Sequence, residues 1–413
     1  MDGVVEIELN EENQWRAETP GGSESWERSP WPRAEKKYFI VSADTHLGPP
    51  TALIRDRIDE KYKHRVARVE KDEDGTMWSV MEDQRQGRIV ESGLTGDDLY
   101  RKLAGSSATH ESDSYNIDKR MADLDLDGVD AELVFPNGTV IMGFLTPDPD
   151  MMHAQFQIYN DWAEEISRGV RGRMNIAACI ATGNIDNAIA EVERVAKMGY
   201  RVITLPNKPV FGPSEPGQIN YNAKSFDPLW ARIEEADLTI TFHVSTGADP
   251  RVAKGPGGAV INFAYHCLTS PADPVANFCA SGLLDRFPKL RFAAVESGIG
   301  WVHWFLDSLD EGYKKHHMWA FPKLKHGLPS DYFRAHGGAT FSEDRIGLEL
   351  IGKFGLEDNF CWANDYPHHE GTFPASAAAI ERTMGHLAEE TRAKLLGLNA
   401  ARLFRFDVPA KYR

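Results

Sequence analysis

A carboxylate and an imidazole side chain, Asp44 and His46, stand at the end of the apolar run in KYFIVSADTH and are candidates for catalysis or metal binding. Such a run is typical of a buried parallel strand whose C-terminal end carries polar groups. Side chains two positions apart on a strand point to the same face, so both groups face one side. This spacing suits two ligands of one divalent cation, although either residue alone could be a hydrogen-bonded structural group.

Further polar residues follow later apolar runs of the chain. They are Lys208, His243, Glu296, Glu343 and Asp365. If the runs are strands of one parallel barrel, their C-terminal ends meet at a single mouth. We therefore expect one divalent metal site there, with the ligands Asp44, His46, His243 and Asp365, and Glu296 as a further ligand. Imidazole and carboxylate together suit borderline cations, so zinc is the first expectation and manganese or iron the alternatives.

Eight short apolar runs alternate with helical patterns from Tyr38 onward. They are KYFIVSADTH, AELVFPNG (131–138), MNIAACIAT (174–182), YRVITLPNK (200–208), LTITFHVSTG (238–247), LRFAAVESG (290–298), GATFSED (338–344) and NFCWANDYP (359–367). This alternation predicts an α/β fold, a (β/α)8 TIM-type barrel, rather than an open doubly wound sheet. An open sheet would need a glycine-rich nucleotide turn, and neither GxGxxG nor GxxxxGKS/T follows the first strand.

Three segments lie outside this regular pattern. Residues 1–36 are polar and predict an N-terminal arm, either packed on a partner subunit or disordered, before a barrel over 37–413. The stretch 47–120 predicts a cap on the active-site face, with helices in LIRDRIDEKYKHRVARVEKDE and a hairpin in TMWSVMEDQRQGRIVES. The stretch 248–280 predicts a second cap element.

Composition narrows the classes of partner. The formal net charge is −16 and no basic run occurs, so we expect no nucleic acid and no anionic membrane as partner. We see neither a signal peptide nor an apolar run near the roughly 20 residues of a membrane helix. Cys179, Cys279 and Cys361 lie in apolar runs, as buried thiols do. We therefore expect a cytoplasmic protein acting on a small-molecule substrate.

Five segments carry a resemblance to a known family. They are VSADTH (41–46), RMADLDLDGVDAELVFP (120–136), FHVSTG (242–247), ASGLLDRFPKLRFAAVESGIGWVHWFLDSLD (280–310) and CWANDYPHHEGTFP (361–374). From Tyr38 to the C-terminus the chain resembles the amidohydrolase-related family typified by aminocarboxymuconate-semialdehyde decarboxylase, with the γ-resorcylate and carboxyvanillate decarboxylases. The resemblance implies a metal-dependent barrel enzyme and a homo-oligomer, by default a homodimer.

The resemblance also implies roles for single residues. Asp44 and His46 stand where the family has its first-strand ligands, and His243 stands at the fifth-strand ligand. Asp365 stands at the eighth-strand aspartate, which binds metal and handles a proton of the bound water. Two positions depart from the decarboxylases: Asp44 replaces His or Glu, and Glu296 replaces a histidine active in proton transfer. A glutamate can act as a base when burial raises its pKa, or it can bind metal.

Four more residues are candidate substrate contacts. His368 follows the DYP motif, and His266 lies in the second cap, from which it could reach the metal. Asn137 and Lys208 end the second and fourth strands. Each of the four could instead be a solvated residue. His303, on an apolar helix face, is expected to be a packed helix residue.

The first functional expectation is metal-dependent hydrolysis of a small organic carboxylate or carbonyl compound. The cation would lower the pKa of a bound water, and His243 would help to hold it. Asp365 would orient the water and take its proton, and Glu296 would assist proton transfer to the leaving group. The alternatives are non-oxidative decarboxylation of the aminocarboxymuconate-semialdehyde type, O2-dependent hydroxylation at a dinuclear iron centre, and a non-catalytic binding barrel. Release of CO2, metal stoichiometry and the presence of metal would distinguish them.

Overall fold

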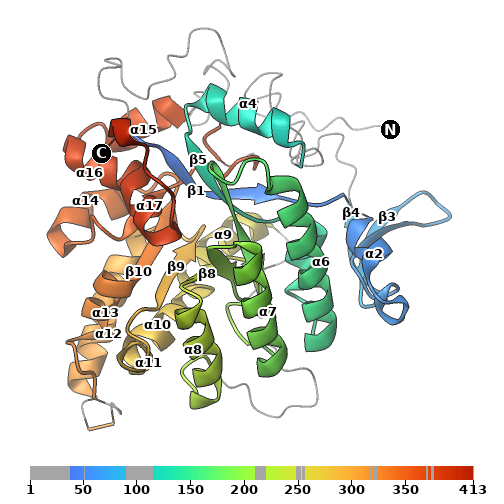
Figure 1. Cartoon of the computed structure of the whole chain (residues 1–413), viewed down its shortest axis with the longest axis horizontal. Helices are drawn as coiled ribbons and strands as arrows, with labels where there is room; N and C mark the ends of the chain where they lie inside the picture. Colours follow the sequence, from blue (N-terminus) through green and yellow to red (C-terminus); the bar gives the residue numbers. More distant parts are fainter. Residues whose placement is uncertain are drawn as a thin grey trace.

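Eight parallel strands form the central sheet of the computed structural model. The structure describes residues 38–50, 52–89, 115–209, 220–247, 253, 256–316, 318–319, 323–368, 371–373 and 376–412. The strand order is β1-β5-β6-β7-β8-β9-β10-β11. A parallel bridge between Thr45 and Tyr366 joins the two ends, so the sheet is nearly closed into a barrel (Figure 1). The expected (β/α)8 architecture is confirmed.

Each strand of the barrel lies within one of the eight apolar runs or extends beyond it by a single residue. The strands are β1 (Val41–Leu47), β5 (Ala131–Pro136), β6 (Met174–Cys179), β7 (Val202–Thr204), β8 (Thr239–His243), β9 (Arg291–Val295), β10 (Gly337–Phe341) and β11 (Phe360–Trp362). Side chains fill the barrel on one face of the sheet and helices cover the other, which is why the runs are apolar without alternation.

Helices connect and cover these strands. They are α4 (Ile117–Asp127), α5 (Thr139–Gly143), α6 (Pro149–Ser167), α7 (Ile185–Met198), η5 (Lys224–Phe226), α8 (Asp227–Glu235), α9 (Gly258–Thr269), α10 (Ala272–Ala280), α11 (Leu283–Arg286), α12 (Gly300–Lys315), α13 (Pro329–His336), α14 (Arg345–Phe354), α15 (Ser376–Met384), α16 (Glu389–Ala393), η6 (Lys394–Leu398), α17 (Asn399–Phe404) and η7 (Ala410–Tyr412). Helix α7 begins where the Asn184 side chain accepts a hydrogen bond from the Asn187 amide and ends at Gly199 in the left-handed conformation. Among the described residues, no helix has the length and apolar character needed to cross a membrane.

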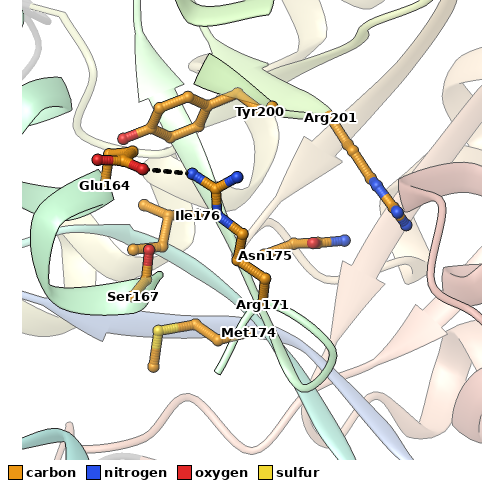
Figure 2. A pocket seen from close by; sticks show the side chains of 9 residues that line it. Glu164, Ser167, Arg171, Met174, Asn175, Ile176, Tyr200 and Arg201 are labelled. Atoms are coloured by element: carbon orange, nitrogen blue, oxygen red, sulfur yellow. Dashed lines mark hydrogen bonds and ion pairs between the residues drawn. The ribbon is translucent and has the colours of Figure 1, made fainter. Parts of the chain in front are cut away.

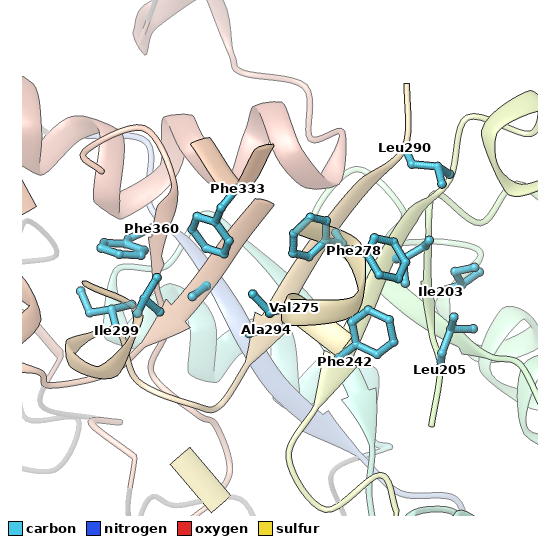
Figure 3. Packing of buried hydrophobic residues seen from close by; sticks show 14 of the residues in the cluster. Ile203, Leu205, Phe242, Val275, Phe278, Leu290, Ala294, Ile299, Phe333 and Phe360 are labelled. Atoms are coloured by element: carbon cyan, nitrogen blue, oxygen red, sulfur yellow. The ribbon is translucent and has the colours of Figure 1, made fainter. Parts of the chain in front are cut away.

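A chain of aromatic contacts packs the outer helices onto the strands that carry the site (Figure 3). Phe242 of β8 lies 5.5 Å from Phe278 of α10, measured between ring centroids, and Phe278 lies 5.0 Å from Phe292 of β9. Phe292 in turn lies 5.9 Å from Phe333 of α13. Burial of each such ring stabilises the fold by about 1.5–3 kcal/mol. This layer therefore fixes β8 and β9, whose ends hold His243 and Glu296.

The first insertion departs from the sequence expectation. Helix α2 (Leu53–Arg57) and η3 (Glu60–Tyr62) are short, and β2 (Arg68–Lys71), β3 (Met77–Met81) and β4 (Gln84–Ile89) form an antiparallel sheet. The helix predicted through 68–71 is therefore wrong, because β2 alternates partly buried and exposed residues and pairs with β3. The hairpin is confirmed, with Glu82 and Asp83 at positive φ in a two-residue turn.

The other sequence expectations about structure have mixed outcomes. The second insertion contains α9 and α10. Cys179, Cys279 and Cys361 are buried free thiols, as predicted. His303 is buried and packs edge-on against two phenylalanine rings, which confirms it as a packed helix residue. The arm over 1–36 lies outside the described residues, and the domain boundary stays a prediction.

Candidate metal centre

Four donor side chains converge at the C-terminal ends of the strands. Asp44 and His46 belong to β1, His243 ends β8, and Glu296 follows β9 directly. One ligand atom from each lies within 4.8 Å of those from the other three. The side chains of Asp44, His46 and His243 are buried, and that of Glu296 is partly exposed. The structure thus gathers residues that are up to 252 positions apart in the chain, from 44 to 296.

Asp365 joins this group through backbone pairing of the last strand with the first. The amide of Asp365 donates to the Asp44 carbonyl at 3.1 Å, and the amide of His46 donates to the Tyr366 carbonyl at 2.7 Å. The pairing places Asp365 Oδ1 3.2 Å from His46 Nε2. Ligand atoms of His46, Asp365 and His368 form a second group of potential donors within 4.8 Å.

The candidate substrate contacts have different surroundings. The Nδ1 atom of His368 lies 3.0 Å from Asp365 Oδ1, and its ring stacks on that of His46 at 4.0 Å. The Nε2 atom of His368 lies 3.4 Å from Asn137 Nδ2, so Asn137 reaches the site through this histidine. Lys208, by contrast, is half-exposed, and its Nζ lies 3.0 Å from Asp273 Oδ2. His266 is in α9, and its side chain lies outside the described part.

Three buried atoms in the first group have the properties of metal ligands. Asp44 Oδ1, His46 Nε2 and His243 Nε2 make no hydrogen bond within the described residues. The other ring nitrogens are engaged: His46 Nδ1 lies 3.3 Å from the Pro136 carbonyl oxygen, and His243 Nδ1 lies 2.7 Å from that of Val244. A proton held at Nδ1 by a carbonyl leaves the Nε2 lone pair free for a cation. Because buried polar atoms rarely lack a partner, this donor set fits a divalent metal, without selecting which.

The charges of the cluster shift one another's titration. Burial raises the pKa of Glu296 to about 8, against the opposing effect of His243. For His243, burial lowers the pKa, but the carboxylates of Asp44 and Glu296 outweigh it and raise the pKa to about 9. Burial and the nearby His368 lower the pKa of His46. Burial opposes ionisation of Asp365, but His368 and His46 hold its pKa well below the usual range. The cluster is thus a set of strongly interacting charges, as at functional sites.

Two of the donors have an unusual backbone conformation. Glu296 has φ of 57° and Asp365 has φ of 56°, both in the left-handed region. Each such residue costs of order 1–3 kcal/mol, and such residues cluster at functional sites. The amide of Glu296 donates to Thr340 Oγ1 at 2.9 Å, which holds the turn after β9. These turns redirect the chain as it leaves each strand.

An arginine that sequence reasoning did not single out supports the first strand. Arg120 of α4 is fully buried and forms a bidentate pair with Glu132, with both N–O distances 2.7 Å. The same guanidinium donates to the His46 carbonyl at 2.7 Å and to Thr45 Oγ1 at 2.9 Å. Its signal in the sequence is a charged residue on the face of α4 that also carries the buried Leu124.

A cavity of about 720 Å³ lies beside the donors and includes Asp44, Glu296 and Asp365 in its wall. Glu343, expected at a strand end, also lines it. Another cavity, of about 370 Å³, lies at the opposite ends of the strands, where β6 and β7 begin. There Arg171 is paired with Glu164 (Figure 2). Of these two cavities, the larger one borders the metal-ligand candidates.

The family follows from a match over most of the chain. A family model described as Amidohydrolase matches residues 84–406. The chain belongs to the amidohydrolase family. It is therefore an enzyme, a metal-dependent hydrolase or carboxy-lyase, and the donor cluster is consistent with a divalent cation as cofactor. No curated protein sequence matches the chain.

Solved structures of other family members share the fold. An amidohydrolase from Mycobacterium avium subsp. paratuberculosis K-10 has a TM-score of 0.71 and 21% identity, covering 91% of this chain and 100% of its own. The 5-carboxyvanillate decarboxylase LigW from Sphingomonas paucimobilis has a TM-score of 0.59 and 21% identity, covering 89% and 99%. The 5-carboxyvanillate decarboxylase from Novosphingobium aromaticivorans, complexed with manganese and 4-hydroxy-3-methoxy-5-nitrobenzoic acid, has a TM-score of 0.63 and 15% identity, covering 92% and 100%. At these identities the likeness concerns the fold.

Proposed function

We propose that this amidohydrolase-family enzyme is a metal-dependent carboxy-lyase that removes CO2 from an aromatic carboxylic acid without O2. The observation that carries the proposal is the open cavity with aromatic walls beside the buried donors of Asp44, His46 and His243. The fold likeness to solved decarboxylases supports decarboxylation over hydrolysis as the first proposal. Hydrolysis, the first expectation from the sequence, becomes the alternative that the experiment below tests.

The side chains divide between holding the cation and handling the proton. Asp44, His46 and His243 would hold the ion through their buried atoms that make no hydrogen bond within the described residues. Asp365, held by His368, would complete the ligand set. A bound divalent cation supplies positive charge that neutralises the substrate carboxylate and the charge developing as CO2 leaves.

Glu296 is the side chain we assign to proton transfer. It lines the cavity and is more exposed than Asp44, so it faces both the substrate space and a route for proton exchange. In the reaction, the bond between the ring carbon and the carboxyl group breaks and its electron pair stays on the ring carbon. CO2 departs as this bond breaks, and a proton from Glu296 forms the new C–H bond. Positioning such a donor typically contributes about 10²–10⁴-fold in rate.

The test uses the Mn²⁺-loaded enzyme with 2,6-dihydroxybenzoate and 5-carboxyvanillate, in D2O and without O2. We expect CO2 release with one deuterium at the decarboxylated carbon. Glu296→Gln should lower kcat by at least about 10²-fold with little change in KM, because it removes the proton donor and keeps the shape. The matched control is Glu343→Gln, which changes a carboxylate in the same cavity wall. Absence of CO2 release together with ¹⁸O uptake from water into products of an ester and lactone panel would instead establish hydrolysis.

A second candidate function rests on the second donor group. Ligand atoms of His46, Asp365 and His368 lie within 4.8 Å of one another, beside the group that contains Glu296. Six side chains are more than one tetrahedral ion needs, so a dinuclear iron centre for O2-dependent hydroxylation fits this count. Elemental analysis of chelator-free protein decides: two irons per chain with O2 consumption favour hydroxylation, and one metal per chain excludes it.

A further inference from the structure

The cavity beside the metal centre has an acidic inner end and an apolar outer wall. We propose that the substrate carries a single acidic head group and an uncharged apolar body that extends beyond one aromatic ring, along Trp301, Trp304 and Ile346. The inference rests on the proposed function, because it assigns the head group to the metal centre. It adds that the apolar outer wall of the cavity binds the uncharged body of the substrate.

The cavity wall, within the described residues, offers no cationic side chain that could bind a second anionic group. Five carboxylates line the cavity, and no Lys, Arg or His does so among the described residues; they are Asp44, Glu296, Glu343, Asp344 and Asp365. Asp344 accepts hydrogen bonds from three backbone amides, and Glu343 is paired with Arg382 outside the cavity lining. A second carboxylate on the substrate would meet like charge without a cationic partner, which disfavours binding.

The outer wall is apolar and partly exposed. Trp301 and Trp304 are three positions apart on α12 and thus lie on neighbouring parts of one helix face. Trp304 is 68% exposed, Ile346 of α14 is 61% exposed, and Phe263 of α9 is 62% exposed, and all three line the cavity. Large apolar side chains left in water around a cavity mark a ligand surface.

The size of the cavity points to the same substrate class. Its volume of about 720 Å³ lies within the range of about 300–1,000 Å³ typical of sites for drug-sized ligands. A single-ring acid held at the metal centre would leave the exposed rings at the outer end in water. An apolar extension would cover them, and each buried methylene would strengthen binding up to about fourfold, the equivalent of 0.8 kcal/mol.

The experiment measures binding, so it does not depend on turnover. The probes are 2-hydroxybenzoate, its 6-propyl, 6-hexyl and 6-nonyl derivatives, and 2-hydroxybenzene-1,3-dicarboxylate, each titrated calorimetrically into Mn²⁺-loaded enzyme. We expect Kd to fall by about twofold to fourfold per methylene along the alkyl series. The dicarboxylate should bind at least tenfold more weakly than 2-hydroxybenzoate.

Variants assign the effect to the apolar wall. Trp304→Ala and Ile346→Ala should each flatten the dependence of Kd on chain length. The matched control is Trp319→Ala, because Trp319 is 75% exposed and does not line the cavity. Equal Kd values along the series, no binding by any member, or an unchanged dependence in Trp304→Ala would overturn the inference. If the alkyl acids bind as expected but release no CO2, the inference stands and the proposed decarboxylation fails.

Discussion

At the scale of single residues, the site is defined by buried polar atoms that lie close to one another without forming hydrogen bonds. Asp44 Oδ1, His46 Nε2 and His243 Nε2 are inaccessible to water and make no hydrogen bond in the described part of the chain. Burying such atoms without partners costs about 1–3 kcal/mol each, more for a charged group. A cation would recover the lost interactions.

Removing one of these imidazoles should remove the metal. We expect His243→Ala to retain less than about a tenth of the wild-type metal after dialysis, because the remaining donors lose a ligand fixed by the Val244 carbonyl. Elemental analysis measures the metal per chain. The control is His386→Ala, since His386 is half-exposed and its Nε2 lies 3.9 Å from Glu349 on the surface. Full metal content in His243→Ala would refute the assigned ligand set.

At the scale of elements, the sequence predicts strands that are buried along their whole length. It does not predict structure that depends on pairing with other parts of the chain. The eight strands were predictable because a buried parallel strand is apolar throughout, and Asp44 and His46 were predictable because strand periodicity places them on one face. The strand β2 was not, because its charged sequence becomes a strand by pairing with β3. The left-handed turns at Glu296 and Asp365 leave no local signal, since glycine, the usual residue there, is absent from both positions.

The pair of Arg120 and Glu132 is an element-scale feature that joins α4 to β1 and β5. Arg120→Met should destabilise the fold by roughly 3–5 kcal/mol, because it leaves the Glu132 carboxylate buried without its partner. The double variant Arg120→Met with Glu132→Leu should recover part of that loss, since neither charge then remains buried. Urea unfolding measures the unfolding free energy of both variants. The control is Arg168→Met, at an exposed residue, which should change the unfolding free energy by close to zero. A double variant no more stable than the single one would contradict this account.

Asp344 holds together the turns that follow β9 and β10. Its carboxylate accepts from the amides of Ile299 and Gly300, both at 2.7 Å, and from that of Gly347 at 2.8 Å. We expect Asp344→Ala to destabilise the protein by about 3 kcal/mol, because three amides lose a charged acceptor. Calorimetry should show a Tm lower by several degrees. Asp407→Ala, at a side chain 94% exposed, should change the Tm by less than about one degree, and an equal shift in both variants would argue against the role.

At the scale of the whole molecule, α4 connects the first part of the barrel to its last strand. Arg120 bonds to β1 through His46, while Asp123 accepts a hydrogen bond from the Tyr366 hydroxyl at 2.8 Å. Asp127, at the end of the helix, accepts from Asn364 Nδ2 at 2.9 Å. The contacts of Asp123 and Asp127 each span more than 200 positions of sequence, so no local pattern could reveal them. They hold the closure of the barrel at the place where Asp365 meets Asp44.

The same closure should make global stability depend on pH. Burial raises the pKa of Asp127 to about 7, although Ser376 and Asn364 donate hydrogen bonds to it. The unfolded chain releases this proton near pH 3.9. Between about pH 4 and 7 the folded state therefore binds more protons than the unfolded state. The stabilising contribution of Asp127 is complete below about pH 4 and is lost as the pH rises through about 7. The loss in unfolding free energy is on the order of 4 kcal/mol.

Asp127→Asn should remove this dependence, because the amide does not titrate. Urea unfolding of both proteins at pH 5, 6, 7 and 8 gives the difference in unfolding free energy, in which the other titrating groups cancel. We expect wild type to lose its advantage over Asp127→Asn between pH 5 and 7 and the difference to level off toward pH 8. The control Asp125→Asn, on a half-exposed residue of the same helix, should run parallel to wild type. Parallel profiles for wild type and Asp127→Asn would mean that Asp127 is ionised in the closed barrel, and that the donors around it suffice to hold a buried charge there.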